Sequence, residues 1–596
     1  MDARKRAVAQ SNGQHLSIIS EIEAGKEMAR AFGAAARSDD PSLARTFGRR
    51  LIRSWWAALS EAAGANAALR AELQAFPTQD IPASAEALAE SLGKTVAALD
   101  AETAAYHIGL IYTGMLPRPH RAERGIYYTP PAITERLIDQ ATAAGIDWAN
   151  ARVLDPACGG GAFLAPVARR ILDTLTGCEA RILVENIATR LHGYEIDPFA
   201  AWLSQVALDA VMLPITEHAG KRLPVVVTVC DSLTKTPPKE RFDLVIGNPP
   251  YGRVKLAPEL REKFRRGLFG HANLYGVFTD LALRHAKSNG VIAYVTPTSF
   301  LSGEYFKALR GLIGCEARPR SFDFVTARRG VFDDVLQETI LAVYQKGYRE
   351  SISVSEITPV QTGQIQVAAA GSGKLPADPA TPWILSRTAK EADLVAAMAS
   401  MPTRLRDWGY RVSTGPLVWN RFKTQLATRA AKGRLPLLWA EAVGSDGSFA
   451  WRADRRGHTK YFEITDKDAW LVTDRSCVLL QRTTAKEQAR RLVAAALPQA
   501  FLDAHGGAVV ENHLNMLRSV SGEPPVSSSV LAAFMNSGAA DRAFRCISGS
   551  VAVSASELEA LPIPDVSALG ELARLVAAHA PGRLIEVECE RLYQES

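Results

Sequence analysis

The chain has 596 residues with a formal net charge of +6, and hydrophobic and charged residues make up 47% and 22% of it. This length allows two or three domains that each bury a core, and the composition is that of an ordinary soluble globular protein. The positive charge is too small to prove a nucleic-acid partner, although it permits one.

The start of the chain and its cysteines argue against several classes of protein. The first residues, MDARKRAVAQSNGQH, are basic but have no apolar segment behind them, and no apolar run has the length of a membrane span. The seven cysteines are scattered, with no C-x-x-C pair and no histidine cluster beside them. We therefore expect a cytoplasmic protein with no membrane partner, no disulfide framework and no metal.

Three compositional regions follow one another along the chain. Residues 1–118 are rich in Ala, Glu and Arg at helical spacing, which predicts a helical N-terminal extension with Trp55 and Trp56 in a core. Residues 119–348 alternate short apolar runs with helical stretches, the pattern of a mostly parallel α/β sheet. Residues 349–596 mix segments with Pro and Gly breaks, which predicts a separate C-terminal domain of mixed α+β structure.

The apolar runs of the middle region are the predicted strands: ARVLD, LHGYEID, VVVTVCD, FDLVIGN, VIAYVTP, SFDFV and ETILAVYQ. Three of these runs end in an acid and one ends in an asparagine. Because ligands of open parallel sheets bind beyond the carboxyl ends of the strands, the chemistry should be sought at those ends.

The first strand leads into the glycine-rich stretch DPACGGGAF. Gly159, Gly160 and Gly161 let the backbone turn sharply and approach a ligand that a Cβ atom would exclude. The stretch lacks the third glycine of G-x-G-x-x-G, which weakens a phosphate-binding interpretation, and a plain tight turn is the alternative.

An acid also follows the second and third strands. Glu195, in GYEIDP, suits a ribose diol because one carboxylate can accept from both hydroxyls, while Asp197 can cap the next helix. Asp231, in VCDSL, can accept the exocyclic amine of an adenine. Together with Asp155, these acids describe a nucleoside-shaped pocket without a phosphate site, which favours S-adenosylmethionine over NAD or ATP.

The fourth strand ends in Asn248, Pro249, Pro250 and Tyr251. A planar amine conjugated to a ring is a poor nucleophile, so an enzyme that methylates it must hold both N–H groups with acceptors. The side-chain oxygen of Asn248 and the carbonyl of Pro249 can be those acceptors, and Tyr251 can stack on the ring. The prolines fix φ and donate no hydrogen bond. The alternative is a Pro-Pro turn that only closes a strand.

In this order, the motifs resemble those of the DNA adenine-N6 methyltransferases of restriction-modification systems, of the gamma class. The matching stretches are GIYYTPPAI, DPACGGGAF, GYEIDP, CDSL, IGNPPYG, NLYGVF, GVIAYVTPTSFL and VFDDVLQETILAVYQK. The resemblance implies the S-adenosylmethionine-dependent methyltransferase fold, a Rossmann-like, mostly parallel seven-stranded sheet with helices on both faces. It also implies S-adenosyl-L-methionine as cofactor and double-stranded DNA as substrate. A separately encoded restriction endonuclease is a possible partner.

The resemblance further implies roles for single residues. Thr129, Asp155 and Ala157 would lie at the methionine end of the cofactor, Glu195 at its ribose and Asp231 at its adenine amine. The full implied cofactor-binding set is Thr129, Asp155, Ala157, Gly159, Gly161, Glu195, Ile196, Asp231, Ser232, Asn248, Pro250 and Phe278. The implied catalytic residues are Asn248, Pro249, Pro250 and Tyr251, and Phe332 would hold the flipped target base together with Tyr251.

Two departures from the family pattern are visible. Gly160 stands where the family often has Ser or Thr, which we expect to change only one turn contact. The segment between Asp155 and Glu195 is long for a single helix and predicts a short insertion. Neither departure removes a catalytic group.

Sequence recognition is expected in the C-terminal region, where cations, amides and aromatics mix in STGPLVWNRFKTQL, WRADRRGHTKYF and LLQRTTAKEQARRL. The candidate DNA contacts are Arg253, Lys255, Arg421, Lys423, Arg482, Lys486 and Arg490. Any one of them can instead be a solvated surface charge, so they count only as a group.

Two other functions stay open. The N-P-P-Y site also serves methylation of an RNA base or of a protein glutamine amide, but those enzymes are usually compact, whereas a long C-terminal region follows the motif here. A catalytically silent DNA-binding relative is the second alternative, and the intact Asn248, Tyr251 and Glu195 argue against it.

Overall fold

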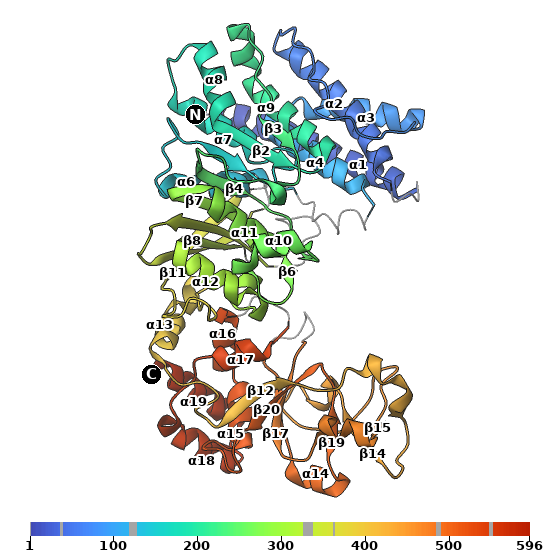
Figure 1. Ribbon diagram of the computed structural model, residues 1–596, viewed down its shortest axis with the longest axis vertical. Helices are drawn as coiled ribbons and strands as arrows, with labels where there is room; N and C mark the ends of the chain where they lie inside the picture. The colour runs from blue at the N-terminus through green and yellow to red at the C-terminus, as the bar shows by residue number, and fades with distance from the viewer. Residues whose placement is uncertain are drawn as a thin grey trace. The chain divides into compact units, whose positions relative to one another are not determined.

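The computed structural model describes residues 2–35, 40–117, 128–325, 338–360, 364–483, 490–547 and 552–595 (Figure 1). The chain forms two compact units. Unit 1 comprises Met1–Pro297 and Leu312–Val367, and unit 2 comprises Thr298–Gly311 and Ala368–Ser596. Unit 1 therefore holds the N-terminal helices together with the sheet, and the predicted boundaries near residues 118 and 348 stay predictions.

The N-terminal part of unit 1 is helical, as its spacing of apolar residues predicts. Its helices are α1 (Asp2–Ala35), α2 (Ser42–Ala62), α3 (Ala83–Val96) and α4 (Ala101–Met115). Apolar residues on the inner faces of these helices form one core, in which Trp55 is 0% exposed and Trp56 is 5% exposed. Both tryptophans are core residues, as expected.

The centre of unit 1 is a large, mostly parallel sheet. Its strand order is β11-β10-β8-β9-β7-β4-β1-β2-β3. The strands are β1 (Val153–Asp155), β2 (Leu191–Glu195), β3 (Val227–Val229), β4 (Phe242–Gly247), β7 (Ala286–Pro297), β8 (Ala317–Val325), β9 (Thr339–Lys346), β10 (Ile352–Pro359) and β11 (Ile365–Gly373). From β7 through β4, β1 and β2 to β3, each strand is parallel to the next one in the sheet. Strand β9 is antiparallel to both of its neighbours, β7 and β8.

The predicted fold class is confirmed, and each predicted strand is present. The sheet has nine strands, not the seven that we expected. The two additional strands, β10 and β11, extend it beyond β8. These two strands follow the break at Gly347, where the sequence pattern changes and the prediction assigned a new domain. The expected insertion between Asp155 and Glu195 is a second helix: α7 (Leu164–Thr174) is followed by α8 (Ala180–Arg190).

Helix α9 (Pro198–Ala219) joins the sheet to the N-terminal helices. It is long and apolar enough to cross a membrane, but 78% of its most apolar window is buried inside the protein. Leu208 and Met212 pack into the core of the sheet, while Phe199 and Trp202 pack into the core of α1–α4. A helix that is buried on both sides is apolar all round for that reason.

Unit 2 contains two smaller sheets and a group of helices. One sheet has the order β12-β20-β17-β18 and the other β13-β15-β14-β19-β16. The strands are β12 (Tyr410–Thr414), β13 (Leu426–Ala427), β14 (Arg434–Leu438), β15 (Tyr461–Glu463), β16 (Val472–Thr473), β17 (Cys477–Gln481), β18 (Ala494–Leu497), β19 (Ala508–Val510) and β20 (Leu514–Ser519). The helices are α13 (Ala392–Ser400), α14 (Gln499–His505), α15 (Ser528–Met535), α16 (Gly538–Ile547), α17 (Ala555–Ala560), α18 (Gly570–Ala577) and α19 (Gly582–Gln594).

Candidate cofactor pocket and catalytic loop

A cavity of about 450 Å³ lies where the strands β1, β2, β3 and β4 end. Residues that directly follow these strands, or end them, reach its wall, as the parallel topology requires. Ten of the residues assigned to the cofactor line it: Thr129, Ala157, Gly159, Glu195, Ile196, Asp231, Ser232, Asn248, Pro250 and Phe278. Asp155 and Gly161 do not line it, because Asp155 is buried at the end of β1 and Gly161 packs against Ser204 of α9. The individual roles stay predictions.

The carboxylate of Glu195 is held by main-chain N–H groups. The amide of Gly159 donates to Oε2 at 2.9 Å, and the amide of Asp197 donates to Oε1 at 2.8 Å. Burial raises the pKa of Glu195, while these hydrogen bonds lower it. Each oxygen keeps a further lone pair. Glu195 therefore presents two fixed acceptors to a ligand in the cavity.

Asp155 is a buried acid with an incompletely satisfied carboxyl group. The amide of Ala157 donates to Oδ1 at 3.0 Å, and Oδ2 has no hydrogen-bond partner among the described residues. Burial raises the pKa of Asp155 to about 8. Gly247 ends β4 beside this group, and a Cβ atom there would lie 2.7 Å from Oδ1. Gly247 thus allows a close approach between the two strand ends, rather than only a turn.

The end of β3 is fixed to the end of β1. Asp231 caps the short helix Ser232–Thr234 by accepting from the amide of Leu233 at 2.9 Å. The hydroxyl of Ser232 donates to the carbonyl of Pro156 at 2.5 Å. Half-exposed Ile196 offers an apolar surface in the same cavity, with 54% of its side chain exposed. An exposed isoleucine between two acids fits a flat adenine with a polar rim.

Tyr128 fills a slot that two glycines make. A Cβ atom would lie 2.0 Å from its Cε1 at Gly109 and 2.3 Å from it at Gly160. The ring is buried and lines the cavity, and its hydroxyl has no hydrogen-bond partner within the described residues. The expectation that Gly160 changes only a turn contact is wrong, because a side chain at this position would displace Tyr128.

The N-terminal helices contribute to the cavity, which the sequence pattern did not predict. Tyr112 of α4 lines it, donates to Asp197 at 3.2 Å, and stacks on Phe199 with ring centroids 4.1 Å apart. Asp197 also accepts from the amide of Phe199 at 2.8 Å and so caps the N-terminus of α9, as we expected from the sequence. Arg45 of α2 lies 3.6 Å from the same carboxylate. No motif marks Tyr112 or Arg45, since helical spacing alone does not separate a site residue from a core residue.

The segment from Asn248 to Tyr251 leaves β4 with its side chains fixed by hydrogen bonds. The amide nitrogen of Asn248 donates to the hydroxyl of Thr129 at 3.1 Å. The Tyr251 hydroxyl lies 2.7 Å from Oδ1 of Asn248 and 3.2 Å from the carbonyl of Val295, and its single proton serves one acceptor at a time. Asn248 therefore lies with its nitrogen toward Thr129 and its oxygen toward Tyr251, at the wall of the cavity.

Six of the seven residues predicted to contact DNA are described, and they fall into three groups. Arg253 and Lys255 are exposed just after the segment from Asn248 to Tyr251, and Lys255 lines the cavity. Arg421 and Lys423 are exposed in unit 2. Arg482 and Arg490 donate to main-chain carbonyls of unit 2, at 3.3 Å to Asn512 and 3.2 Å to Ser445, which are contacts of a structural arginine. Phe332 and Lys486 lie outside the described residues.

Known proteins resemble the chain over this region and beyond it. A family model described as Eco57I restriction-modification methylase matches residues 226–331. The type II methyltransferase M.BsuBI of Bacillus subtilis is 26% identical over 467 residues, covering 77% of this chain and 91% of that protein. The type II methyltransferase M.PstI of Providencia stuartii is 28% identical over 352 residues, covering 56% of this chain and 68% of that protein.

A solved structure agrees at the level of the fold. The type IIL restriction-modification enzyme MmeI, solved in complex with DNA, superposes with a TM-score of 0.51 at 13% identity, over 97% of this chain and 91% of that one. The cavity fits S-adenosyl-L-methionine, because it joins the fixed acceptors of Glu195, the apolar face of Ile196 and the ring of Tyr128, whose hydroxyl has no hydrogen-bond partner among the described residues. The chain is a methyltransferase of the restriction-modification type, and S-adenosyl-L-methionine is its methyl donor.

Proposed function

We propose that the chain is a site-specific DNA methyltransferase that methylates N6 of an adenine turned out of the duplex, as the modification enzyme of a restriction-modification system. The observation that carries this proposal is the fixed Asn248 side chain beside the cofactor cavity, with Tyr251 next to it. The named relatives are type II methyltransferases, and MmeI was solved with DNA, which supports DNA as the substrate.

The proposed chemistry rests on holding the amine. The cofactor supplies an electrophilic methyl group. Oδ1 of Asn248 and the carbonyl of Pro249 accept the two N–H groups of the adenine, so that its nitrogen turns a lone pair toward the methyl. Thr129 anchors the other end of the Asn248 amide at 3.1 Å, which keeps the oxygen, and not the nitrogen, available to the base. If the Asn248 amide were turned over, its NH2 group would face the N–H donors of the adenine and could not accept from them.

Tyr251 has two tasks in this proposal. Its ring offers a face on which the flipped adenine stacks, which offsets part of the cost of leaving the duplex, at about 1 to 3 kcal/mol per stacked base. Its hydroxyl holds Asn248, and the edge-to-face contact with Tyr275, at 6.2 Å and 83°, fixes the ring. Phe332 is proposed as the second surface against the base.

Transfer of label from tritiated S-adenosylmethionine tests the substrate class. The purified chain is incubated with unmethylated genomic DNA, with total RNA and with soluble protein in separate reactions. We expect label in DNA, and hydrolysis to nucleosides should place it on adenine. Label that appears only in RNA or only in protein would refute DNA as the substrate and favour one of the other planar amines.

A further inference from the structure

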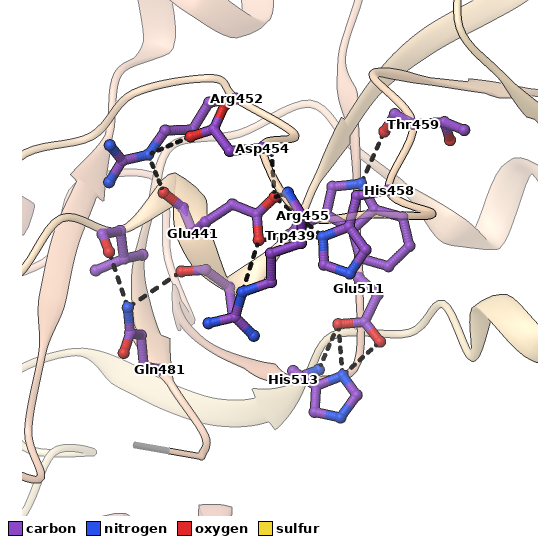
Figure 2. A network of polar contacts seen from close by, with 12 residues as sticks. Trp439, Glu441, Arg452, Asp454, Arg455, His458, Thr459, Gln481, Glu511 and His513 are labelled. Carbon is purple, nitrogen blue, oxygen red and sulfur yellow. Dashed lines mark hydrogen bonds and ion pairs between the residues drawn. The ribbon is translucent and has the colours of Figure 1, made fainter. Parts of the chain in front are cut away.

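Unit 2 contains a cavity of its own, here called the second cavity, with a volume of about 150 Å³. Figure 2 shows the polar contacts of several residues that line it, among them His458, Glu511 and His513. Its lining includes Trp419, Trp439, Arg455, His458, Glu511 and His513. These residues come from loops around β14, β15, β19 and β20, so segments far apart in the sequence build it. The volume suits one planar heterocycle, and the lining joins aromatic faces with charged groups.

One wall of the second cavity is aromatic. The indole of Trp439 stacks on the imidazole of His458, with centroids 3.9 Å apart and planes at 10°. Nε1 of Trp439 donates to the carbonyl of Thr459 at 2.7 Å, which fixes the ring, and only 1% of the residue is exposed. Trp419 stands at 65° to Trp439, with centroids 6.3 Å apart. Unstacked nucleobases are recognised on such aromatic surfaces.

A wholly buried carboxylate forms another wall. Glu511 is 0% exposed, and in the described part of the chain its carboxylate contacts His513: the amide donates to Oε2 at 2.8 Å, and Nδ1 lies 2.7 Å from Oε1 and 2.9 Å from Oε2. Taking a carboxylate out of water costs several kcal/mol unless hydrogen bonds replace the lost hydration. His513 supplies only part of that replacement, so the donors of a ligand in the cavity would complete it. The acid is therefore a fixed acceptor pair at the edge of the cavity.

A second acid–imidazole pair stands behind the aromatic wall. Glu441 accepts from Nδ1 of His458 at 3.0 Å and from the amide of Asp454 at 2.8 Å, and Nε of Arg455 lies 3.4 Å from it. Figure 2 shows these contacts converging on Glu441. They hold the His458 ring parallel to Trp439 and keep the base of Arg455 near the rim, where 72% of its side chain is exposed. The wall is thus rigid, and its cation is accessible.

We propose that the second cavity binds one unpaired guanine base of the nucleic-acid substrate, with N1–H and the N2 amino group on the Glu511 carboxylate. The inference rests on the proposed function, which supplies the nucleic acid. Guanine alone among the four bases of DNA presents two adjacent donors on its Watson–Crick edge. Adenine and cytosine would turn an acceptor toward the carboxylate, and thymine has one donor, N3–H, with a carbonyl on either side of it. The exposed Arg455 is a donor for the acceptor edge of guanine.

Paired titrations of the full chain with GMP and IMP test the choice of base, because IMP lacks only the N2 amino group. Saturating S-adenosylhomocysteine blocks the first cavity, and saturation-transfer NMR on the nucleotide reports binding. We expect GMP to bind at least about fivefold more tightly than IMP. In Glu511→Gln the two Kd values should converge, whereas Glu463→Gln, which removes an exposed partner of Arg434, should keep the difference. Equal Kd values in the natural chain would overturn the proposal.

Thymidine oligonucleotides that carry a single deoxyguanosine or a single deoxyinosine test the same site in a nucleic acid. The guanine-containing strand should bind more tightly, and His513→Ala should remove that preference, which keeps the test open if Glu511→Gln fails to fold. A preference that survives in both variants would overturn the proposal. These assays involve no methyl transfer, so a chain that fails to methylate DNA but still prefers guanine would refute only the proposed function.

Discussion

Buried acids lie in or beside both cavities, but the two units hold them in different ways. In unit 1, Asp155 and Glu195 lie at strand ends, accept from main-chain amides, and have pKa values raised by burial. In unit 2, Glu441 and Glu511 accept from imidazole side chains as well as from amides. Within the described residues, the acids of unit 1 are therefore held by main-chain groups alone, whereas those of unit 2 are also paired with an imidazole side chain.

Replacing Asn248 should give the largest effect on activity. Asn248→Ala removes the acceptor for the target amine, and we expect methyl transfer to fall by about a hundredfold to a thousandfold. Cofactor affinity should change by less than about threefold, since one side-chain contact of many is lost. Initial rates of label transfer and calorimetric titration with the cofactor measure the two quantities.

The matched control for this change is Asn186→Ala, which removes a partly exposed amide on α8 that bonds only its own helix in the described contacts. Its rate should equal that of the natural chain. If Asn248→Ala kept most of its activity, or lost cofactor affinity in step with its rate, the role of Asn248 as a holder of the base would be wrong.

Glu195→Gln should weaken the cofactor rather than the chemistry. The amide nitrogen of glutamine would oppose one of the two N–H donors, from Gly159 or Asp197, that the carboxylate now accepts. We expect the affinity for S-adenosylhomocysteine to fall about tenfold to a hundredfold, measured by calorimetry. Glu185→Gln, at an exposed ion pair with Lys221, should leave it unchanged, and similar losses in both variants would contradict the assignment.

The slot for Tyr128 predicts an effect on stability. Gly160→Ser places a Cβ atom into the Tyr128 ring, so the free energy of unfolding should drop by about 1 to 3 kcal/mol. Gly114→Ala, on the same helix as Gly109 but with open space around it, should raise that free energy by up to about 1 kcal/mol. Chemical denaturation measures both, and equal stabilities of the two variants would show that the slot adapts.

The raised pKa of Asp155 predicts that the stability of the chain depends on pH. Its pKa is about 8 in the folded protein and 3.8 in its ordinary range, so between these values the folded chain holds a proton that the unfolded chain has released. The contribution of this proton to stability is lost as the pH rises through that window. Relative to Asp155→Asn, the natural chain should therefore lose about 1 kcal/mol or more between about pH 5 and pH 8.

Denaturation of the two proteins at both pH values, without cofactor, measures this difference. A constant gap between natural chain and variant would mean that Asp155 is ionised in the fold. Glu441→Gln serves as the contrast from unit 2: it replaces one of the two carboxylate oxygens with an N–H donor that would oppose His458 or the main-chain amides, and it should destabilise the chain by about 1 to 3 kcal/mol.

The sheet and the first cavity could be predicted because parallel strands bring their carboxyl ends to one edge. Asp155, Glu195, Asp231 and Asn248 follow or end four strands, so their order in the chain already implied their nearness in space. The extra strands β10 and β11 were missed because the break at Gly347 resembles a domain boundary. Tyr112 and Tyr128 were missed because their place depends on helices that pack on α9, which no local pattern encodes.

The second cavity could not be predicted for a related reason. Trp439, His458 and Glu511 lie in loops between short antiparallel strands, and their meeting depends on how two sheets of unit 2 turn back on themselves. The sequence did mark STGPLVWNRFKTQL and WRADRRGHTKYF as mixtures of aromatics and cations, and these stretches supply Trp419, Arg455 and His458. Composition thus located the region, but the acids that shape it came from elsewhere in the chain.

The most direct test of the central claim is nucleoside mass spectrometry of DNA from a host that lacks endogenous adenine methylation and expresses this chain. We predict N6-methyldeoxyadenosine in that DNA, confined to one sequence context by long-read sequencing, and its loss with Asn248→Ala. Methylation of cytosine instead, or methyl groups found in RNA or protein while the DNA stays unmodified, would contradict the claim.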